Sequence, residues 1–167
     1  MKNVYFLMLV FSFVTTTGFS QNYKLKAVVL YSFTRYVMWP EAASTGDFVI
    51  KVLGESSFES ELKVMAQSKK VGNRAIKVNR IEDIADVSDC HILVIPASQS
   101  ARLEELLAKL QGLPVLVVTE EPGLGTIGSD INFVDRDGRL AFELNQSTIN
   151  NRKLKVSTEL TRLAILI

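Results

Sequence analysis

The chain has 167 residues, of which 47% are hydrophobic and 22% are charged. This composition predicts one globular domain that is large enough to bury a substantial core. Lys and Arg together number 19 and Asp and Glu number 18, so there is no basic excess to release counterions from nucleic acid. Neither DNA nor RNA is an expected partner.

Residues 1–20 have the pattern of a cleaved secretory signal peptide. Lys2 gives the segment a positive start, an apolar run extends to Val14, and Ser20 is a small residue at the expected cleavage position. The run is shorter than the roughly 20 apolar residues that a membrane-spanning helix needs. We therefore expect cleavage, followed by export of residues 21–167 as a single soluble domain that does not insert into the membrane.

The next segment predicts a helix that is followed by alternating strands and helices. Residues 23–38 carry apolar side chains at steps of three and four, and Pro40 ends this pattern. Residues 48–53 (FVIKVL) are expected to form a buried strand. A helix that ends near Gln67 should follow, and then a strand at residues 75–81.

Two later segments are continuous apolar runs. They are HILVI at residues 91–95 and PVLVVT at residues 114–119. Such runs are typical of parallel strands that helices cover on both faces. A leucine-rich helix should lie between them and end near Gly112.

The last part of the chain predicts a hairpin and two short helices. Residues 131–134 and 139–144 flank the turn sequence DRDG, which favours an antiparallel pair. Residues 146–152 and 157–167 are expected to be helical. The order of elements predicts an α/β three-layer sandwich, with a mostly parallel central sheet that ends in an antiparallel C-terminal hairpin.

Residues 31–40 (YSFTRYVMWP) hold four aromatic side chains, although only 8% of the chain is aromatic. Phe33 and Tyr36 lie on the apolar stripe of the predicted helix, which favours a place in the core. Trp39 lies where that helix should end. Its ring is expected either to cover the sheet or to anchor a partner.

The alternation in residues 139–145 (RLAFELN) indicates a second candidate surface. It places Glu143 on the strand face opposite Phe142 and its apolar neighbours, so reversal of the Glu143 charge should leave the fold intact. A solvated carboxylate is one interpretation, and a mixed polar and apolar surface for a partner is the other. Terminal strands are also natural dimer edges, which favours a homodimer. The residues predicted to bind a partner are Trp39, Asn132, Glu143, Asn145 and Ile149.

Three motifs suggest catalysis or cofactor binding, and each lacks a feature that its chemistry needs. Residues 123–128 (GLGTIG) match a dinucleotide-binding pattern, but a strand instead of a helix should follow them. Cys90 and His91 are neighbours on a strand, so their side chains point to opposite faces. Glu120 and Glu121 lack a partner nucleophile or metal. We expect no catalytic residue, metal site or cofactor.

Six stretches, in register, resemble the YfiR family of exported bacterial proteins over residues 23–165. They are LKAVVLYSFTRYVMWP, FVIKVLG, CHILVIPAS, PVLVV with its glycine-rich loop, INFV with GRLAFELN, and LKVSTELTRLA. The resemblance implies a periplasmic, non-catalytic regulator that binds the periplasmic part of an inner-membrane diguanylate cyclase. Repression of that enzyme would lower cyclic di-GMP and biofilm formation.

One feature departs from the family pattern. Cysteines that form disulfides in YfiR have no full counterpart, because Cys90 is the only cysteine of this chain. Redox control of that kind is therefore not expected. Cys90 should be a buried thiol, with an interchain disulfide as the alternative.

The alternative function is that of a periplasmic small-ligand sensor or solute-binding protein. Its cleft would lie near the carboxyl ends of the parallel strands, where open α/β sheets bind ligands. The residues expected to line it are Pro96, Ser98, Thr119, Gly123 and Gly125.

Overall fold

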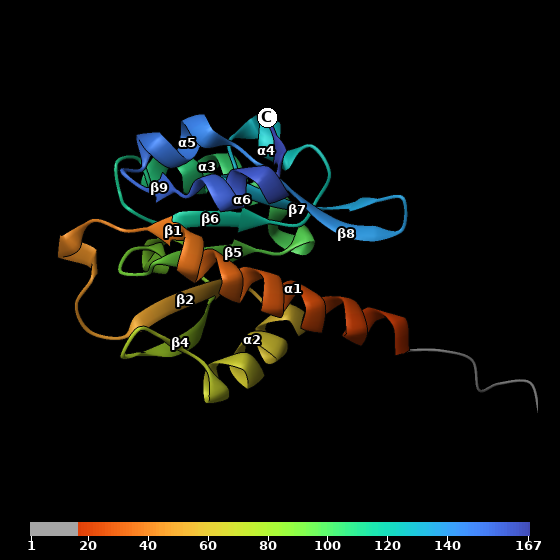
Figure 1. Cartoon of the computed structure of the whole chain (residues 1–167), viewed down its shortest axis with the longest axis horizontal. Helices are drawn as coiled ribbons and strands as arrows, with labels where there is room; N and C mark the ends of the chain where they lie inside the picture. The colour runs from red at the N-terminus through yellow and green to blue at the C-terminus, as the bar shows by residue number, and fades with distance from the viewer. Residues whose placement is uncertain (1–16) are drawn as a thin grey trace, which may run out of the picture.

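The computed structural model describes residues 17–167 (Figure 1). Residues 1–16, which hold most of the predicted signal peptide, lie outside this range, so cleavage stays a prediction. The helices are α1 (Thr17–Tyr36), α2 (Ser57–Ser68), α3 (Leu103–Lys109), α4 (Leu124–Ile127), α5 (Gln146–Asn151) and α6 (Thr158–Leu163). Short 3-10 turns are η1 (Glu41–Ala43), η2 (Ile84–Val87) and η3 (Ala97–Arg102).

One large sheet organises the described residues. Its strands are β2 (Phe48–Leu53), β3 (Lys70–Val71), β4 (Arg74–Ile81), β5 (Ile92–Ile95), β6 (Leu116–Thr119), β7 (Ile131–Arg136), β8 (Arg139–Leu144) and β10 (Ile165–Leu166). They lie in the order β10-β8-β7-β6-β5-β2-β4-β3. The strands from β4 to β7 are parallel, and β7 and β8 form an antiparallel hairpin. The predicted fold class is confirmed.

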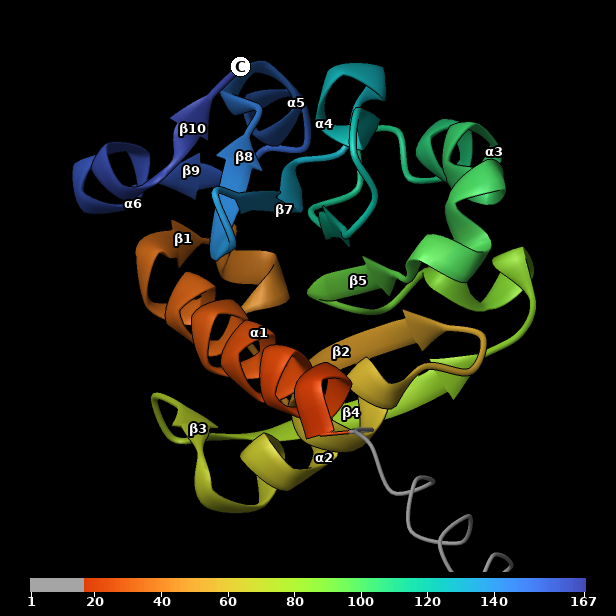
Figure 2. The ribbon, with the colours of Figure 1, turned by 90° about the vertical axis from the view of Figure 1, so that its right-hand side faces the viewer.

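Alternation along the central strands creates two cores. Phe48, Ile50 and Val52 of β2 pack in the cluster that α1 and α2 cover. Leu53 at the end of β2 and Leu93 of β5 belong to the second cluster, which α3 covers. Figure 2 shows α1 and α3 on opposite sides of β2 and β5. The continuous apolar runs of the sequence thus serve both faces of one sheet.

The first helix ends two residues earlier than predicted. Val37 and Met38 form β1 (Val37–Met38), which pairs with β9 (Lys155–Val156) in a separate antiparallel ladder. Because Pro40 disfavours helical geometry just before it, the chain leaves the helix and becomes extended. Phe33 is fully buried and lies 5.2 Å from Phe142 between ring centroids, as the core prediction requires.

The predicted helix at residues 157–167 is only partly correct. It ends at Leu163, and β10 then adds a parallel strand to the outer side of β8. The hairpin is therefore not the edge of the sheet at Glu143 and Leu144, which pair with Ile165 and Leu166. No helix of the described residues is long and apolar enough to cross a membrane.

Candidate functional site

A buried polar network joins β6, β7 and β8. The strand register places Thr119 beside Asn132 and Asn132 beside Glu143. Thr119 Oγ1 lies 2.8 Å from both Ser129 Oγ and Asn132 Oδ1, and Asn132 Nδ2 donates to Glu143 Oε2 at 2.9 Å. Thr119, Ser129 and Asn132 are fully buried, whereas Glu143 is partly exposed. The network therefore holds one carboxylate in a defined position at the surface.

Helix α4 lies directly against this carboxylate. A Cβ atom at Gly125 would be 2.7 Å from Glu143 Oε2 and 2.6 Å from Ile167 Cδ1, so the helix can approach only because Gly125 has no side chain. Asn145 Nδ2 donates to Gly125 O at 3.2 Å, and Asn145 Oδ1 accepts from Thr148 N as the cap of α5. One asparagine thus joins α4 to α5 beside Glu143.

An exposed apolar side chain lies beside this position. Ile167 is 43% exposed and approaches Gly125 next to Glu143, whereas Ile127 of α4 lies toward η3 and α3. Ile167 follows β10 on the strand face of Glu143, and Figure 1 shows the C-terminus beside α4, in agreement with the close approach of Ile167 to Gly125. We call Glu143, Asn145 and Ile167 the C-terminal surface. Its fixed carboxylate beside exposed apolar area can pair with a cationic group of a partner and so give specificity.

The structure corrects part of the predicted partner surface. Asn132 and Ile149 are fully buried, so a partner cannot contact them in this conformation. Asn132 is covered because α4 closes over the β7–β8 face, and Ile149 is covered because α5 packs into the core. Glu143 and Asn145 do lie together.

Trp39 lies in a different place from Glu143. Its Nε1 donates to His91 O at 3.2 Å, and its ring meets Phe48 edge-on with centroids 5.1 Å apart. Phe48 and His91 mark the starts of β2 and β5, whereas Asn132 pairs with the last residue of β6. Trp39 covers the sheet there and remains partly exposed.

The residues of the predicted ligand cleft lie in different surroundings. Pro96 is buried before η3, and Thr119 is buried in the polar network. Ser98 is exposed on η3, and Gly123 is exposed at the start of α4, while Gly125 is covered by Glu143 and Ile167. Gly125 therefore cannot face a ligand in this conformation, and a ligand-binding role of the other four residues stays a prediction.

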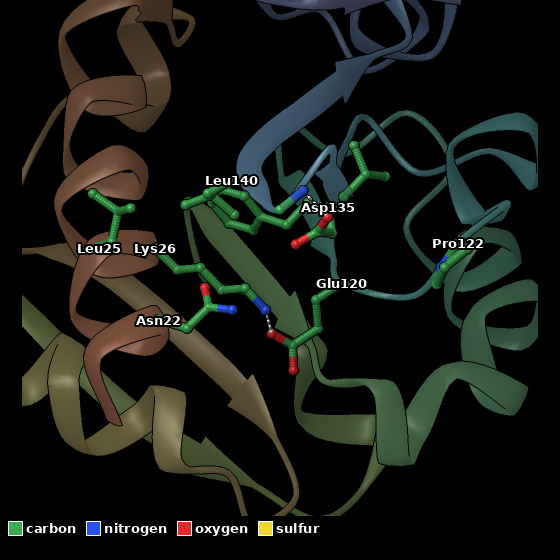
Figure 3. A pocket seen from close by; sticks show the side chains of 10 residues that line it. Asn22, Leu25, Lys26, Glu120, Pro122, Asp135 and Leu140 are labelled. Carbon is green, nitrogen blue, oxygen red and sulfur yellow. Dashed lines mark hydrogen bonds and ion pairs between the residues drawn. The ribbon is translucent and has the colours of Figure 1, made fainter. Parts of the chain in front are cut away.

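A cavity of about 520 Å³ lies instead between α1 and the β7–β8 hairpin (Figure 3). Leu25 and Leu140 form apolar walls, and Asp135 lies at the hairpin. Lys26 and Glu120 meet on its surface, with 2.8 Å between Nζ and Oε2. Their side chains are only 12% and 3% exposed. The cavity is therefore lined by an ion pair that is largely shielded from water.

Glu120 is the residue that the sequence interpretation missed. It appears in the sequence as one of two adjacent loop carboxylates, which are normally solvated. The available signal was its position directly after β6, a strand that is covered on both faces. The same carboxylate lies 3.5 Å from the Tyr23 hydroxyl, and burial, with help from Glu120, raises the pKa of Tyr23.

Cys90 and His91 have separate surroundings. Cys90 Sγ is buried 3.4 Å from Val87 O, and burial raises the pKa of its thiol to about 12. His91 Nδ1 accepts from Val49 N at 3.0 Å, and its Nε2 lies 2.8 Å from Ala43 O. The histidine thus holds the η1 loop against the sheet, and both of its ring nitrogens are engaged in these contacts.

The glycine motif lacks the geometry of a dinucleotide site. Gly123 has a φ of 88° and Gly128 a φ of 135°, so both use backbone conformations that favour glycine. A four-residue helix lies inside the motif, and β7 follows it. Among the described residues, no group of three or more His, Cys, Asp or Glu side chains is placed to hold a metal ion.

The fold and the site define a class of protein: an α/β domain with a mostly parallel sheet, a polar network under a short helix, and an exposed apolar C-terminal surface. The chain belongs to the YfiR/HmsC-like family, whose model matches residues 23–165. A comparison with curated proteins finds no match. Membership of this family implies a periplasmic regulator of diguanylate cyclase signalling rather than an enzyme.

Proposed function

We propose that the protein binds the periplasmic part of an inner-membrane diguanylate cyclase and represses it. Repression lowers cyclic di-GMP and, with it, biofilm formation. The observation that carries this proposal is the family match over residues 23–165, which covers nearly all of the described chain. No single residue of this protein specifies the partner enzyme, so the partner has to be identified by experiments in the cell.

The C-terminal surface is the proposed contact. Glu143 keeps its carboxylate in place through Asn132, so little side-chain entropy is lost when a partner pairs with it. Ile167 supplies apolar area beside that charge. In this proposal Asn132 and Ile149 support the surface from inside, and Trp39 forms a separate contact at the other end of the sheet.

The experiment is deletion and complementation in the native host. Loss of the protein should raise cyclic di-GMP, and expression of the wild-type chain should restore the low level. Crosslinking in living cells through a photoreactive residue at Ile167 should capture a diguanylate cyclase, with Lys109 on α3 as the matched control position. An unchanged cyclic di-GMP level after deletion in a strain that expresses the captured cyclase contradicts the proposal.

We also propose a homodimer that forms through the C-terminal edge, which consists of Leu163, Leu166 and the outer side of β10. Leu163 is 69% exposed and Leu166 is 55% exposed. No strand pairs with the outer side of β10 in the described part of the chain. An apolar, unpaired strand edge favours pairing with a second copy.

Small-ligand sensing is a second candidate function, and the cavity between α1 and the hairpin favours it. The shielded Lys26–Glu120 pair offers both a donor and an acceptor beside apolar walls. A saturable thermal shift with one nucleotide or amino acid, lost in the Lys26→Met variant, would support this function. The absence of any shift across such a panel counts against it.

A further inference from the structure

The edge of the sheet opposite β10 is also open. Strand β4 pairs with β2 from Ile76 to Ile81, but its other side pairs with β3 only at Arg74 and Ala75. The outer side of residues 76–81 therefore has no strand partner among the described residues. Backbone donors and acceptors on such an edge are ready to pair with an added strand.

This edge lies in a strongly basic segment. From Leu62 to Ile81 the chain has no Asp or Glu and has six cationic residues: Lys63, Lys69, Lys70, Arg74, Lys77 and Arg80. The whole chain has a net charge of only +1, so the positive charge is concentrated here.

Half of these cations already have partners. Lys63 and Arg80 both pair with Glu59, each at 2.6 Å. Arg74 donates to backbone carbonyls of the loop before β2, among them Gly46 O at 2.7 Å. Lys69, Lys70 and Lys77 are exposed and form no ion pair within the described residues. Three ammonium groups thus remain for an acidic partner.

A groove of about 330 Å³ runs beside the open edge, between α2 and β4. Ala66, Ile76 and Val78 give it an apolar lining, and Lys63 lies at its side. In an added strand, alternate side chains point to opposite faces of the sheet. One set would enter the groove, and the other would lie on the opposite face, where Lys77 points.

We propose that the β4 edge, defined as residues 76–81 with the flanking Lys69 and Lys70, binds an extended acidic segment of a partner protein by strand addition. A second copy of this chain is a poor occupant, because each β4 edge carries Lys77 and Arg80 and has no acidic residue at positions 76–81, so two such edges repel each other. Charged side chains on an open strand can serve only to prevent aggregation, but Lys77 on the strand itself already does this. Lys69 and Lys70 add charge beyond that need and favour an acidic partner.

This inference does not depend on diguanylate cyclase regulation, so its test uses only the purified protein. The probe is a nine-residue peptide of alternating threonine and glutamate, blocked at both ends. In a titration followed by backbone amide NMR at low salt, the shifted signals should be confined to residues 63–81, and binding should weaken as salt is added. Shifts centred on any other part of the chain overturn the proposal.

Two comparisons separate strand addition from simple charge attraction. N-methylation of alternate peptide residues removes backbone donors and should abolish binding, since charge alone is not enough. Lys77→Glu should weaken binding about tenfold, whereas Lys109→Glu on α3, which is also an exposed lysine, should not change it. Equal binding of the N-methylated peptide, or equal effects of the two variants, overturns the proposal, as does self-association of the wild-type chain through residues 76–81.

Discussion

At Glu143 the carboxylate accepts a hydrogen bond from Asn132 Nδ2 at 2.9 Å while the side chain stays partly exposed. Reversal of the Glu143 charge should therefore destabilise the fold more than the strand alternation predicts. A lysine would leave the Asn132 amide facing a cation and would crowd Gly125. The loss of a hydrogen bond to a charged group costs about 1.5–3 kcal/mol.

The sharper test of the C-terminal surface is Glu143→Gln. The glutamine oxygen can still accept from Asn132, so we expect a melting temperature close to that of the wild type. Removal of the charge should weaken repression, and cyclic di-GMP in the complemented deletion strain should stay above the wild-type level. Glu104→Gln, on the exposed side of α3, is the matched control and should restore the low level fully. Full restoration by Glu143→Gln would show that Glu143 does not contact the partner through its charge.

His91 should make stability depend on pH. Burial lowers the pKa of His91 from its ordinary value of 6.5, and the nearby Arg74 adds to the effect. Protonation of Nδ1 would also break the bond from Val49 N. Between the native pKa and 6.5 the native state binds fewer protons than the unfolded chain, so the free energy of unfolding falls as the pH falls through this range.

The measurement is urea unfolding at several pH values between 7.5 and 5.5, with His91→Gln as the comparison. His91 is the only histidine of the chain. The difference between the two proteins should therefore shrink as the pH falls, whatever the absolute stability of the variant. A difference that stays constant over this range contradicts a lowered pKa.

At the scale of elements, α1 is joined to the end of β6 by the Lys26–Glu120 pair. The two atoms are 2.8 Å apart, and Lys26 Nζ also lies 4.9 Å from the centroid of the Tyr23 ring. Removal of one partner leaves the other charge shielded from water and unpaired, so Glu120→Gln should lower the free energy of unfolding by about 3 kcal/mol.

A double-mutant cycle tests this connection. Lys26→Met combined with Glu120→Gln should cost clearly less than the sum of the single changes, because neither variant side chain is charged. Chemical denaturation of the four proteins gives the coupling energy. Strict additivity would mean that the pair contributes nothing to the attachment of α1.

Near the C-terminus, the position of helix α4 is linked to that of strand β10. Gly125 permits contact with Glu143 and Ile167, and the Asn145 side chain fastens α4 to α5. Helix α4 has only four residues and is too short to be stable by itself. Its position therefore depends on β10, and a change in either element should alter the C-terminal surface.

At the scale of the whole molecule, the two edges of the sheet differ in character. The β10 edge is apolar, whereas the β4 edge is basic. The proposed homodimer uses the first, so Leu166→Lys should convert a dimer to a monomer in sedimentation velocity. Val64→Lys, on α2, changes a similarly exposed residue and should leave the dimer intact. A wild-type protein that sediments as a monomer at all concentrations contradicts the proposed dimer.

The sequence by itself determined the layers of the fold and the family resemblance. Continuous apolar runs such as residues 91–95 report that both faces of a strand are covered, and the DRDG turn reports a hairpin. These are local properties, because the side-chain period of a strand is set by its own backbone. The pattern around Glu143 was likewise enough to place its side chain opposite Phe142.

Only the tertiary structure decided which distant residues meet. Lys26 and Glu120 are 94 positions apart, and Asn132 became buried because α4 closes over it. Trp39 and Glu143 were both predicted to contact a partner, but they lie at different ends of the sheet. Periodicity tells which face a side chain occupies, whereas the partner across that face depends on strand order and on the close approach that Gly125 allows.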